Sequence, residues 1–302
     1  MTDRLGDHCG RFLAQLADCN PDICVLDGDL ADSDGAIWFA QRYPSRFFMA
    51  GIAEQNLVSI AAGLASCGLR PFVFSFAAFL CYRAYDQIRM GLSQSRERVT
   101  LVASHSGGAT GRNGSSHAAL NDLALIGSLP GLTVWCPADK ADVEFAIQSV
   151  LSHSSPAYLR LPRVPTPELP GAAAPFRWLY PATPASIVST GYATHWAIAA
   201  RNLLAERGIE LGLLHWAQID PTPAGFTEEI SQLERCVVIE DHYSIGGIAS
   251  RITSLGFGGG VTAIGWPSTW IGCSGVDAEV LAANKLSTEH IAERIFLWLN
   301  KG

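Results

Sequence analysis

The sequence predicts an α/β protein built from two doubly wound domains. Strand-like apolar runs alternate with helical patterns in the first half of the chain, and the same alternation returns in the second half. A stretch rich in proline and alanine separates the two halves. The length of 302 residues suits two domains, and 48% hydrophobic residues with 29 glycines is an ordinary composition for a folded α/β chain.

In the first domain, assigned to residues 1–164, four apolar runs predict buried parallel strands at 23–26, 72–74, 99–103 and 133–136. Residues 57–65 are apolar and rich in alanine, which predicts a buried helix. Seven prolines between positions 162 and 184 predict an extended linker, assigned to 165–184. The second domain, 185–302, repeats the pattern with strands at 186–189, 212–216, 236–240 and 261–264 and helices at 193–207 and 247–255.

Glu54 is a lone carboxylate among small and apolar residues, just before the helix predicted at 57–65. Negative charge stabilises a helix N-terminus, which is one explanation. The next apolar run carries Phe76, Phe79 and Tyr82 three residues apart, a spacing that places them on one face of a helix. Packing in the protein core would be a sufficient explanation for the three aromatic residues if they were considered without Glu54. Rings together with one acid also suit a planar heteroaromatic ligand, whose faces the rings hold while the acid contacts a ring nitrogen.

Two histidines, His105 and His117, lie in a glycine-rich segment after the strand predicted at 99–103. Open α/β sheets bind ligands at the carboxyl ends of their strands, and glycine lets the backbone approach a ligand closely. These histidines are therefore candidates for an active site, since an ordinary imidazole titrates near neutrality. A flexible surface turn with solvated imidazoles is the alternative.

The chain resembles the thiamin-diphosphate enzymes of the transketolase family in three stretches: GIAEQNLVSIAAGLASCGLRPFVFSFAAFLCYRAYDQIR, GSLPGLTVWCPADKADV and PAYLRLPR. The resemblance runs with few gaps from about Leu5 to the C-terminus. It implies a thiamin-diphosphate-binding pyrimidine domain followed by a transketolase C-terminal-like domain. Because the C-terminal domain of this family serves mainly in subunit assembly, we expect no catalytic residue there.

The same resemblance implies a cofactor site around Glu54, which would contact the N1′ nitrogen of the aminopyrimidine. A proton at N1′ favours the imino form of the cofactor's own amino group, which can then remove the thiazolium C2 proton. Asp29 would approach the thiazolium side. The ring pocket would consist of Phe76, Phe79 and Tyr82.

For the substrate, the resemblance implies that His105 and His117 contact hydroxyl groups and assist proton transfers. Arg163 and Ser33 match positions that hold a sugar phosphate. Asn113 stands where transketolases usually carry an aspartate that recognises a substrate hydroxyl. An amide keeps an acceptor oxygen but loses the charge and adds a donor.

A second departure lies beside this one, where the family's usual Thr-His-Gln reads Ser116-His117-Ala118. This removes another polar group but keeps the histidine. We therefore expect an acceptor that differs from an ordinary sugar phosphate.

A complete transketolase also carries a diphosphate-binding domain with a Gly-Asp-Gly motif and a later Asn that hold the metal, and we find no such pair. The resemblance thus implies one half of a split enzyme, with no metal ligand of its own. A separate N-terminal transketolase-like subunit would hold the diphosphate and Mg²⁺ or another divalent cation. We expect a heterotetramer of two plus two chains.

The expected function is transfer of a two-carbon ketol unit from a ketose-type donor to an aldehyde acceptor. Three alternatives stay open: a deoxyxylulose-phosphate synthase-like subunit, a 2-oxo acid dehydrogenase beta-type subunit, and a non-catalytic regulatory partner. Decarboxylation of a 2-oxo acid would mark either of the first two. Retention of Glu54 and both histidines argues against the third.

The composition limits the kinds of binding partner and the cellular compartment that we expect for this protein. A net charge of −7 without clusters of Lys and Arg argues against nucleic acid. The longest apolar run is too short to cross a bilayer, and the N-terminus lacks the layout of a signal peptide. Eight cysteines without a Cys-x-x-Cys pair favour reduced thiols. We therefore expect a cytoplasmic protein that acts on small molecules.

Overall fold

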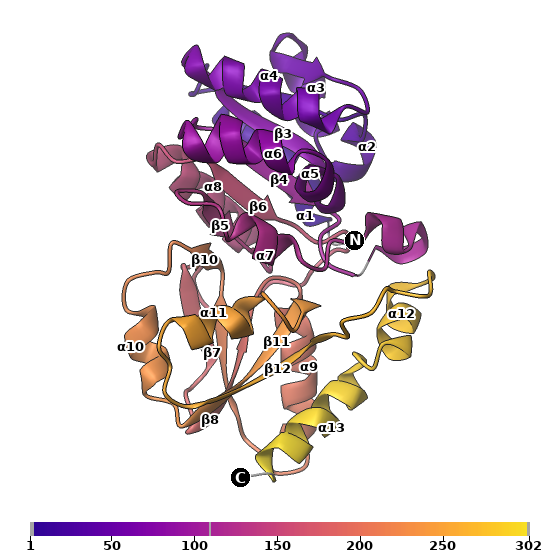
Figure 1. Ribbon diagram of the computed structural model, residues 1–302, viewed down its shortest axis with the longest axis vertical. Helices are drawn as coiled ribbons and strands as arrows, with labels where there is room; N and C mark the ends of the chain where they lie inside the picture. The colour runs from indigo at the N-terminus through magenta and orange to yellow at the C-terminus, as the bar shows by residue number, and fades with distance from the viewer. Residues whose placement is uncertain (1–2, 109, 301–302) are drawn as a thin grey trace.

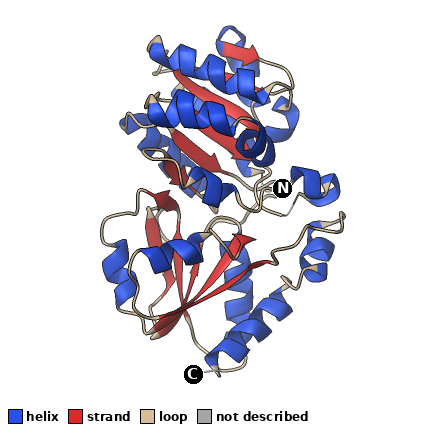
Figure 2. Ribbon diagram, in the orientation of Figure 1, coloured by secondary structure: helices blue, strands red, loops and turns tan. Residues whose placement is uncertain are grey.

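The computed structural model describes residues 3–108 and 110–300 and contains two sheets, one in each half of the molecule (Figure 1). In both halves the strands run between layers of helices (Figure 2). The predicted α/β class with two doubly wound domains is confirmed. Within the described residues, no helix combines the length and apolarity needed to cross a membrane.

The first sheet has seven strands in the order β10-β5-β6-β4-β3-β1-β2. All neighbours are parallel except β10, which runs antiparallel to β5. The bounds are β1 Ile23–Asp27, β2 Phe47–Met49, β3 Arg70–Phe76, β4 Thr100–Ser104, β5 Thr133–Trp135, β6 Ala157–Arg160 and β10 Gln218–Asp220.

Helices bury both faces of this sheet. Along β3, Phe72 and Phe74 pack into the core cluster that also holds side chains of α1, α3 and α8, whereas Val73 packs into the cluster with α4, α5 and α7. The helix bounds are α1 Leu5–Leu16, α2 Ala31–Asp34, α3 Ile37–Arg42, α4 Glu54–Ser66, α5 Ala77–Arg83, α6 Tyr85–Gln87, α7 Asp122–Ile126 and α8 Lys140–Ser152, with a π-helix at Ile88–Gln94 and 3₁₀ turns at Pro44–Arg46, Gly111–Asn113 and Ser115–His117.

The second sheet has five strands in the order β12-β11-β8-β9-β7, with only β7 antiparallel to its neighbour. The strands are β7 Phe176–Tyr180, β8 Ala185–Ser189, β9 Gly212–Trp216, β11 Arg235–Tyr243 and β12 Gly260–Trp266. The helices are α9 Ala193–Ala205, α10 Phe226–Ser231, α11 Ile248–Ser254, α12 Asp277–Ala283 and α13 Thr288–Leu299.

Four strands were not predicted from the sequence: β2, β6, β7 and β10, of which the last two change the expected domain organisation. Residues 176–180, expected within an extended linker, form β7 and extend the second sheet. Residues 218–220 leave the second domain and pair with β5 of the first sheet, with Gln218 opposite Trp135. The halves of the molecule are therefore joined by strand pairing as well as by the connecting chain.

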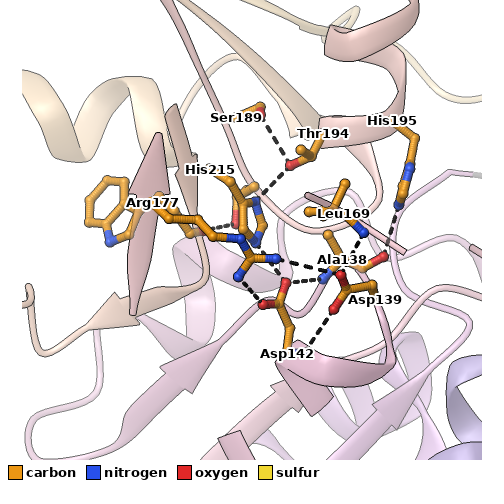
Figure 3. Close-up of polar contacts among 11 residues, drawn as sticks. Ala138, Asp139, Asp142, Leu169, Arg177, Ser189, Thr194, His195 and His215 are labelled. Carbon is orange, nitrogen blue, oxygen red and sulfur yellow. Dashed lines mark hydrogen bonds and ion pairs between the residues drawn. The ribbon is translucent and has the colours of Figure 1, made fainter. Parts of the chain in front are cut away.

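A buried polar network lies where the two halves meet (Figure 3). Asp142, on α8, accepts hydrogen bonds from Arg177 of β7 at 2.5 Å and from His215 of β9 at 2.9 Å. Thr194 Oγ1 lies 2.8 Å from the other ring nitrogen of His215. Burial alone would raise the pKa of Asp142, but His215 and Arg177 outweigh it and hold the pKa at about 2. Asp142 is therefore a carboxylate at neutral pH.

We expect Asp142→Ala to lower the free energy of unfolding by about 3–5 kcal/mol, because the buried cation Arg177 loses a partner. Urea denaturation of the purified chain measures this change. The matched control is Asp86→Ala, which breaks an exposed ion pair with Arg89 and should cost at most about 1 kcal/mol. Equal losses in the two variants would contradict the prediction.

Candidate active site

The candidate site lies at the carboxyl edge of the first sheet, where the direction of strand addition reverses between β1 and β3. From β1 the chain adds β2 on one side and later β3 on the other. Ligands of open α/β sheets bind at such a switch point. Asp29 follows β1, Phe76 ends β3 and His105 follows β4. Strand register therefore places these three predicted residues along one edge.

Two phenylalanines and the two predicted histidines form one cluster of rings. The ring of Phe76 stacks on that of His105 with centroids 3.8 Å apart and on that of Phe79 at 5.4 Å. His117 meets Phe79 edge-on at 5.1 Å and Phe76 at 6.0 Å. The fold thus brings together side chains from β3, α5 and the glycine-rich segment after β4.

His105 is held in an uncommon conformation. Its φ is +53°, in the left-handed region, and only 4% of the residue is exposed. Ser104 Oγ lies 3.2 Å from Nδ1. Burial, with smaller contributions from the charges of Arg163 and Arg4, lowers the pKa of His105 to about 3. The imidazole is therefore neutral at physiological pH and can both donate and accept a hydrogen bond.

Glu54 begins α4 and is 3% exposed, but it is not an isolated carboxylate. Arg83 Nη1 lies 3.0 Å from one carboxylate oxygen and 3.2 Å from the other. The guanidinium carbon of Arg83 also lies 3.9 Å from the centroid of the Phe79 ring. Arg83 therefore connects the acid to the ring cluster. Arg83 was not predicted as a site residue, although an arginine four residues after Phe79 lies on the same helix face.

The aromatic run does not form a single helix. Phe76 ends β3, and α5 begins at the next residue, so only Phe79 and Tyr82 lie on the helix. Tyr82 is 47% exposed, and its hydroxyl donates to Asn121 Oδ1. It lines a cavity of about 480 Å³ that Tyr243 and Trp270 of the second domain also line. The structure thus places Tyr82 beside the ring cluster, facing a neighbouring cavity.

The remaining predicted residues lie around this cluster. Asp29 is exposed and has a φ of +71°. Ser33 is half-buried in α2, and its carbonyl accepts from Arg4 Nη1 at 2.8 Å. Asn113 is exposed on the turn Gly111–Asn113.

Arg163 packs directly against this turn, since a Cβ at Gly111 would lie 2.5 Å from its Nη1 and 3.5 Å from Asp277 Oδ1. Asp277 comes from the second domain, so the cation expected to bind a phosphate has a carboxylate in its surroundings. Within the described residues, no group of three His, Cys, Asp or Glu side chains could hold a metal ion.

The donor set fits half of thiamin diphosphate. A buried carboxylate beside stacked rings matches the edge and faces of an aminopyrimidine. Two imidazoles on the same rings supply hydrogen-bonding groups next to it. The diphosphate needs cations or a metal, and the described residues contain no group of three His, Cys, Asp or Glu side chains that could hold a metal ion for it.

Beneath the segment that carries Asp29 and Ser33 lies a pair of buried acids. Asp27 and Asp34 are 0% and 1% exposed. Asp27 accepts from the amide of Leu30 at 2.7 Å, and Asp34 accepts from the amide of Ala36 at 3.1 Å. Burial raises the pKa of both carboxyls, and in Asp34 the charge of Asp27 raises it further.

The fold and the site together define a two-domain α/β protein with a buried carboxylate and a cluster of rings at its switch point. Residues 5–167 match the profile described as "Transketolase, pyrimidine binding domain", and residues 179–291 match "Transketolase, C-terminal domain". The chain belongs to the transketolase family, whose members are thiamin-diphosphate-dependent transferases.

Its relatives include chains of the same extent. A "Putative transketolase C-terminal section" of Methanocaldococcus jannaschii is 32% identical, with 97% of this chain and 95% of that protein covered. A solved structure titled "Split gene transketolase, inactive beta4 tetramer" has a TM-score of 0.86 at 30% identity, with 96% of each chain covered. The "6-deoxy-6-sulfo-D-fructose transketolase subunit SqwH" of Clostridium sp. is 30% identical over 79% of this chain and 76% of its own length. The chain is thus homologous to split-gene transketolase subunits.

The buried acid pair predicts a dependence of stability on pH. A carboxyl whose folded pKa is raised contributes stability below its unfolded value, about 4, and loses it as pH rises through the folded pKa. Asp34→Asn should reduce that loss, because one of the two charges can no longer form. Melting temperatures from pH 5 to 9 measure it, with the exposed Asp32→Asn as control. A wild-type slope retained in Asp34→Asn would contradict this assignment.

Proposed function

We propose that the chain is one subunit of a split thiamin-diphosphate-dependent transketolase. It would transfer a two-carbon ketol unit from a ketose-type donor to an aldehyde acceptor, and only with a second subunit that binds the diphosphate and its divalent cation. The observation that supports this most is the joining of Glu54, through Arg83, to a stacked ring cluster with two imidazoles at the switch point.

In this proposal the residues of the chain bind, orient and hold protons. Bound thiamin diphosphate supplies a thiazolium whose positive nitrogen is the electron sink for cleavage of the donor's carbon–carbon bond. Glu54 holds a proton at the ring nitrogen N1′, and Phe76 and Phe79 hold the faces of the aminopyrimidine. His105 and His117 hydrogen-bond the substrate hydroxyls and move their protons. A neutral His105 suits the hydrogen-bonding part of that role, because one ring nitrogen can donate and the other can accept.

The same proposal gives roles to the residues around this centre. Asp29 approaches the thiazolium, Tyr82 contributes a ring from the neighbouring cavity to the cofactor's surroundings, and Ser33 and Arg163 hold the far end of the substrate. Asn113 is exposed on its turn and stands free to meet a substrate hydroxyl, where its amide offers a donor as well as an acceptor. Asn113 should therefore influence which aldehyde acceptor the enzyme uses.

The assembly in this proposal is a heterotetramer of two such chains and two partners, in the cytoplasm. Relatives of the same extent carry names that point to a separate section or a split gene, which supports a separate N-terminal partner. The division into 1–164, 165–184 and 185–302 stays part of the proposal. β7 shows that the predicted linker contains a strand, and β10 shows that a strand of the second domain pairs with the first sheet.

The test is ketol transfer by the chain reconstituted with the product of the neighbouring reading frame, thiamin diphosphate and Mg²⁺. We expect Glu54→Gln to lower kcat at least about 100-fold, since one positioned proton carrier contributes about that much. Its far-ultraviolet circular dichroism and melting curve should show a folded chain. The matched control is Glu97→Gln, an acid outside the site, which should keep wild-type turnover.

Other results of the same assay would decide against the proposal. Release of CO₂ from pyruvate or another 2-oxo acid, without ketol transfer, would indicate a deoxyxylulose-phosphate synthase-like or 2-oxo acid dehydrogenase beta-type subunit. Equal stimulation of a complete enzyme by wild type and Glu54→Gln would indicate a regulatory partner. Turnover of ketoses by the isolated chain would remove the need for a second subunit.

A further inference from the structure

The histidine segment, residues 105–117, is anchored on the second domain. The amide of Gly108 donates to Asp241 Oδ1 at 3.0 Å, and the indole Nε1 of Trp266 donates to the same oxygen at 2.6 Å. Asp241 lies in β11 and Trp266 in β12, and they are 1% and 0% exposed. A carboxylate of one domain thus fixes a backbone amide of the other.

The glycines of the segment fit these two side chains closely. A Cβ at Gly107 would lie 1.8 Å from Asp241 Oδ2, and a Cβ at Gly108 would lie 2.2 Å from the indole ring of Trp266. Gly107 also has a φ of +75°, where a side chain is strained. The segment carries glycine here because groups of the second domain occupy the space.

The second domain also contacts the segment near its middle and the chain just beyond its end. The amide of Tyr243, two residues after Asp241, donates to the carbonyl of Leu120 at 2.8 Å. The amide of Gly275 donates to the carbonyl of Gly111 at 3.4 Å. These contacts come from the second domain, which therefore touches the described part of the segment at Gly107, Gly108 and Gly111.

We propose that Asp241 is a positioning residue, whose carboxylate holds the histidine segment so that His105 and His117 face the ring cluster. The second domain therefore takes part in building the site, although no residue of it was expected to. The importance of this for catalysis rests on the proposed function, but the placement of the segment can be tested on the isolated chain.

Domain packing alone does not account for an acid at this position. A fully buried carboxyl costs free energy unless it is hydrogen-bonded, and burial raises the pKa of Asp241. Its Oδ2 has no hydrogen-bond partner among the described residues. Arg160 is a buried cation beside Asp241, but its guanidinium donates to the backbone carbonyl of Asp241 at 2.8 Å and not to the carboxyl group. What the carboxyl itself binds is the amide of Gly108 and the indole of Trp266.

Histidine NMR on the isolated chain tests the proposal. In the wild type, ¹³C-labelled His105, assigned with a His105→Gln variant, should show no titration between pH 5 and 8, because its pKa is about 3. Burial against Phe76 and the charges of Arg163, Arg4 and His117 set that value. In Asp241→Ala the freed segment should let His105 titrate toward about 6.5, the value of a solvated imidazole.

Glu240→Ala is the matched control. Glu240 is the preceding residue of β11, is also fully buried, and accepts from the amide of Ile248 at 2.7 Å on the side of α11. Its loss should lower the melting temperature while His105 stays silent. Titration of His105 in both variants would reduce Asp241 to a general packing role and overturn the proposal, as would silence in both.

Asp241→Asn covers the case in which Asp241→Ala does not fold. An amide keeps the acceptor and the shape but not the charge, and charged hydrogen bonds are roughly twice as strong as neutral ones. We expect His105 to stay silent in this variant, while the amide of Gly108 exchanges with solvent about tenfold faster than in the wild type. Unchanged exchange at Gly108 would overturn the proposal.

Discussion

The buried guanidinium of Arg160 is the interaction on which the rest of the structure depends. At 3% exposure it cannot be solvated, so the fold must surround it with acceptors. It finds the carboxylate of Asp122 at 2.7 Å in its own domain and the carbonyl of Asp241 at 2.8 Å in the other, with the carbonyl of Ala119 at 3.4 Å. A single cation at the end of β6 thereby holds the start of α7, the backbone at Ala119 and the carboxyl-terminal part of β11.

The same need for compensation shapes the candidate site. Glu54 could be buried among rings only with a cation beside it, and Arg83 meets this need while its plane covers Phe79. The ring nitrogen of a bound aminopyrimidine would then be a second partner for the carboxylate and not its first. His105 solves the problem in the opposite way, by staying neutral. Two different interactions therefore control the groups proposed to handle protons. An ion pair with Arg83 stabilises Glu54, whereas burial away from water keeps His105 neutral.

The elements predicted correctly from the sequence are those with a clear apolar run or a helical spacing of apolar residues. Buried runs such as 99–103 became central strands, and Glu54 did begin its helix. β7 was missed because Pro175 and Pro181 flank it and made the whole stretch read as a linker, and β10 was missed because it has only three residues. β2 and β6, of three and four residues, were missed as well. The orientation of Tyr82 and the reach of Asp241 toward Gly108 could not be predicted, because both depend on how the domains pack. Arg83 could have been predicted, because its spacing of four residues from Phe79 places both side chains on one helix face.

The strand β10 has a consequence for how the chain can be divided. Residues 218–220 belong by position to the second domain, yet they cover the outer edge of β5, and the amide of Cys136 donates to the carbonyl of Ala217 beside them at 2.7 Å. A fragment ending in the proline-rich stretch would expose β5 as an open edge, a template for aggregation. A cut at the visible linker would therefore separate β5 from the strand that covers it.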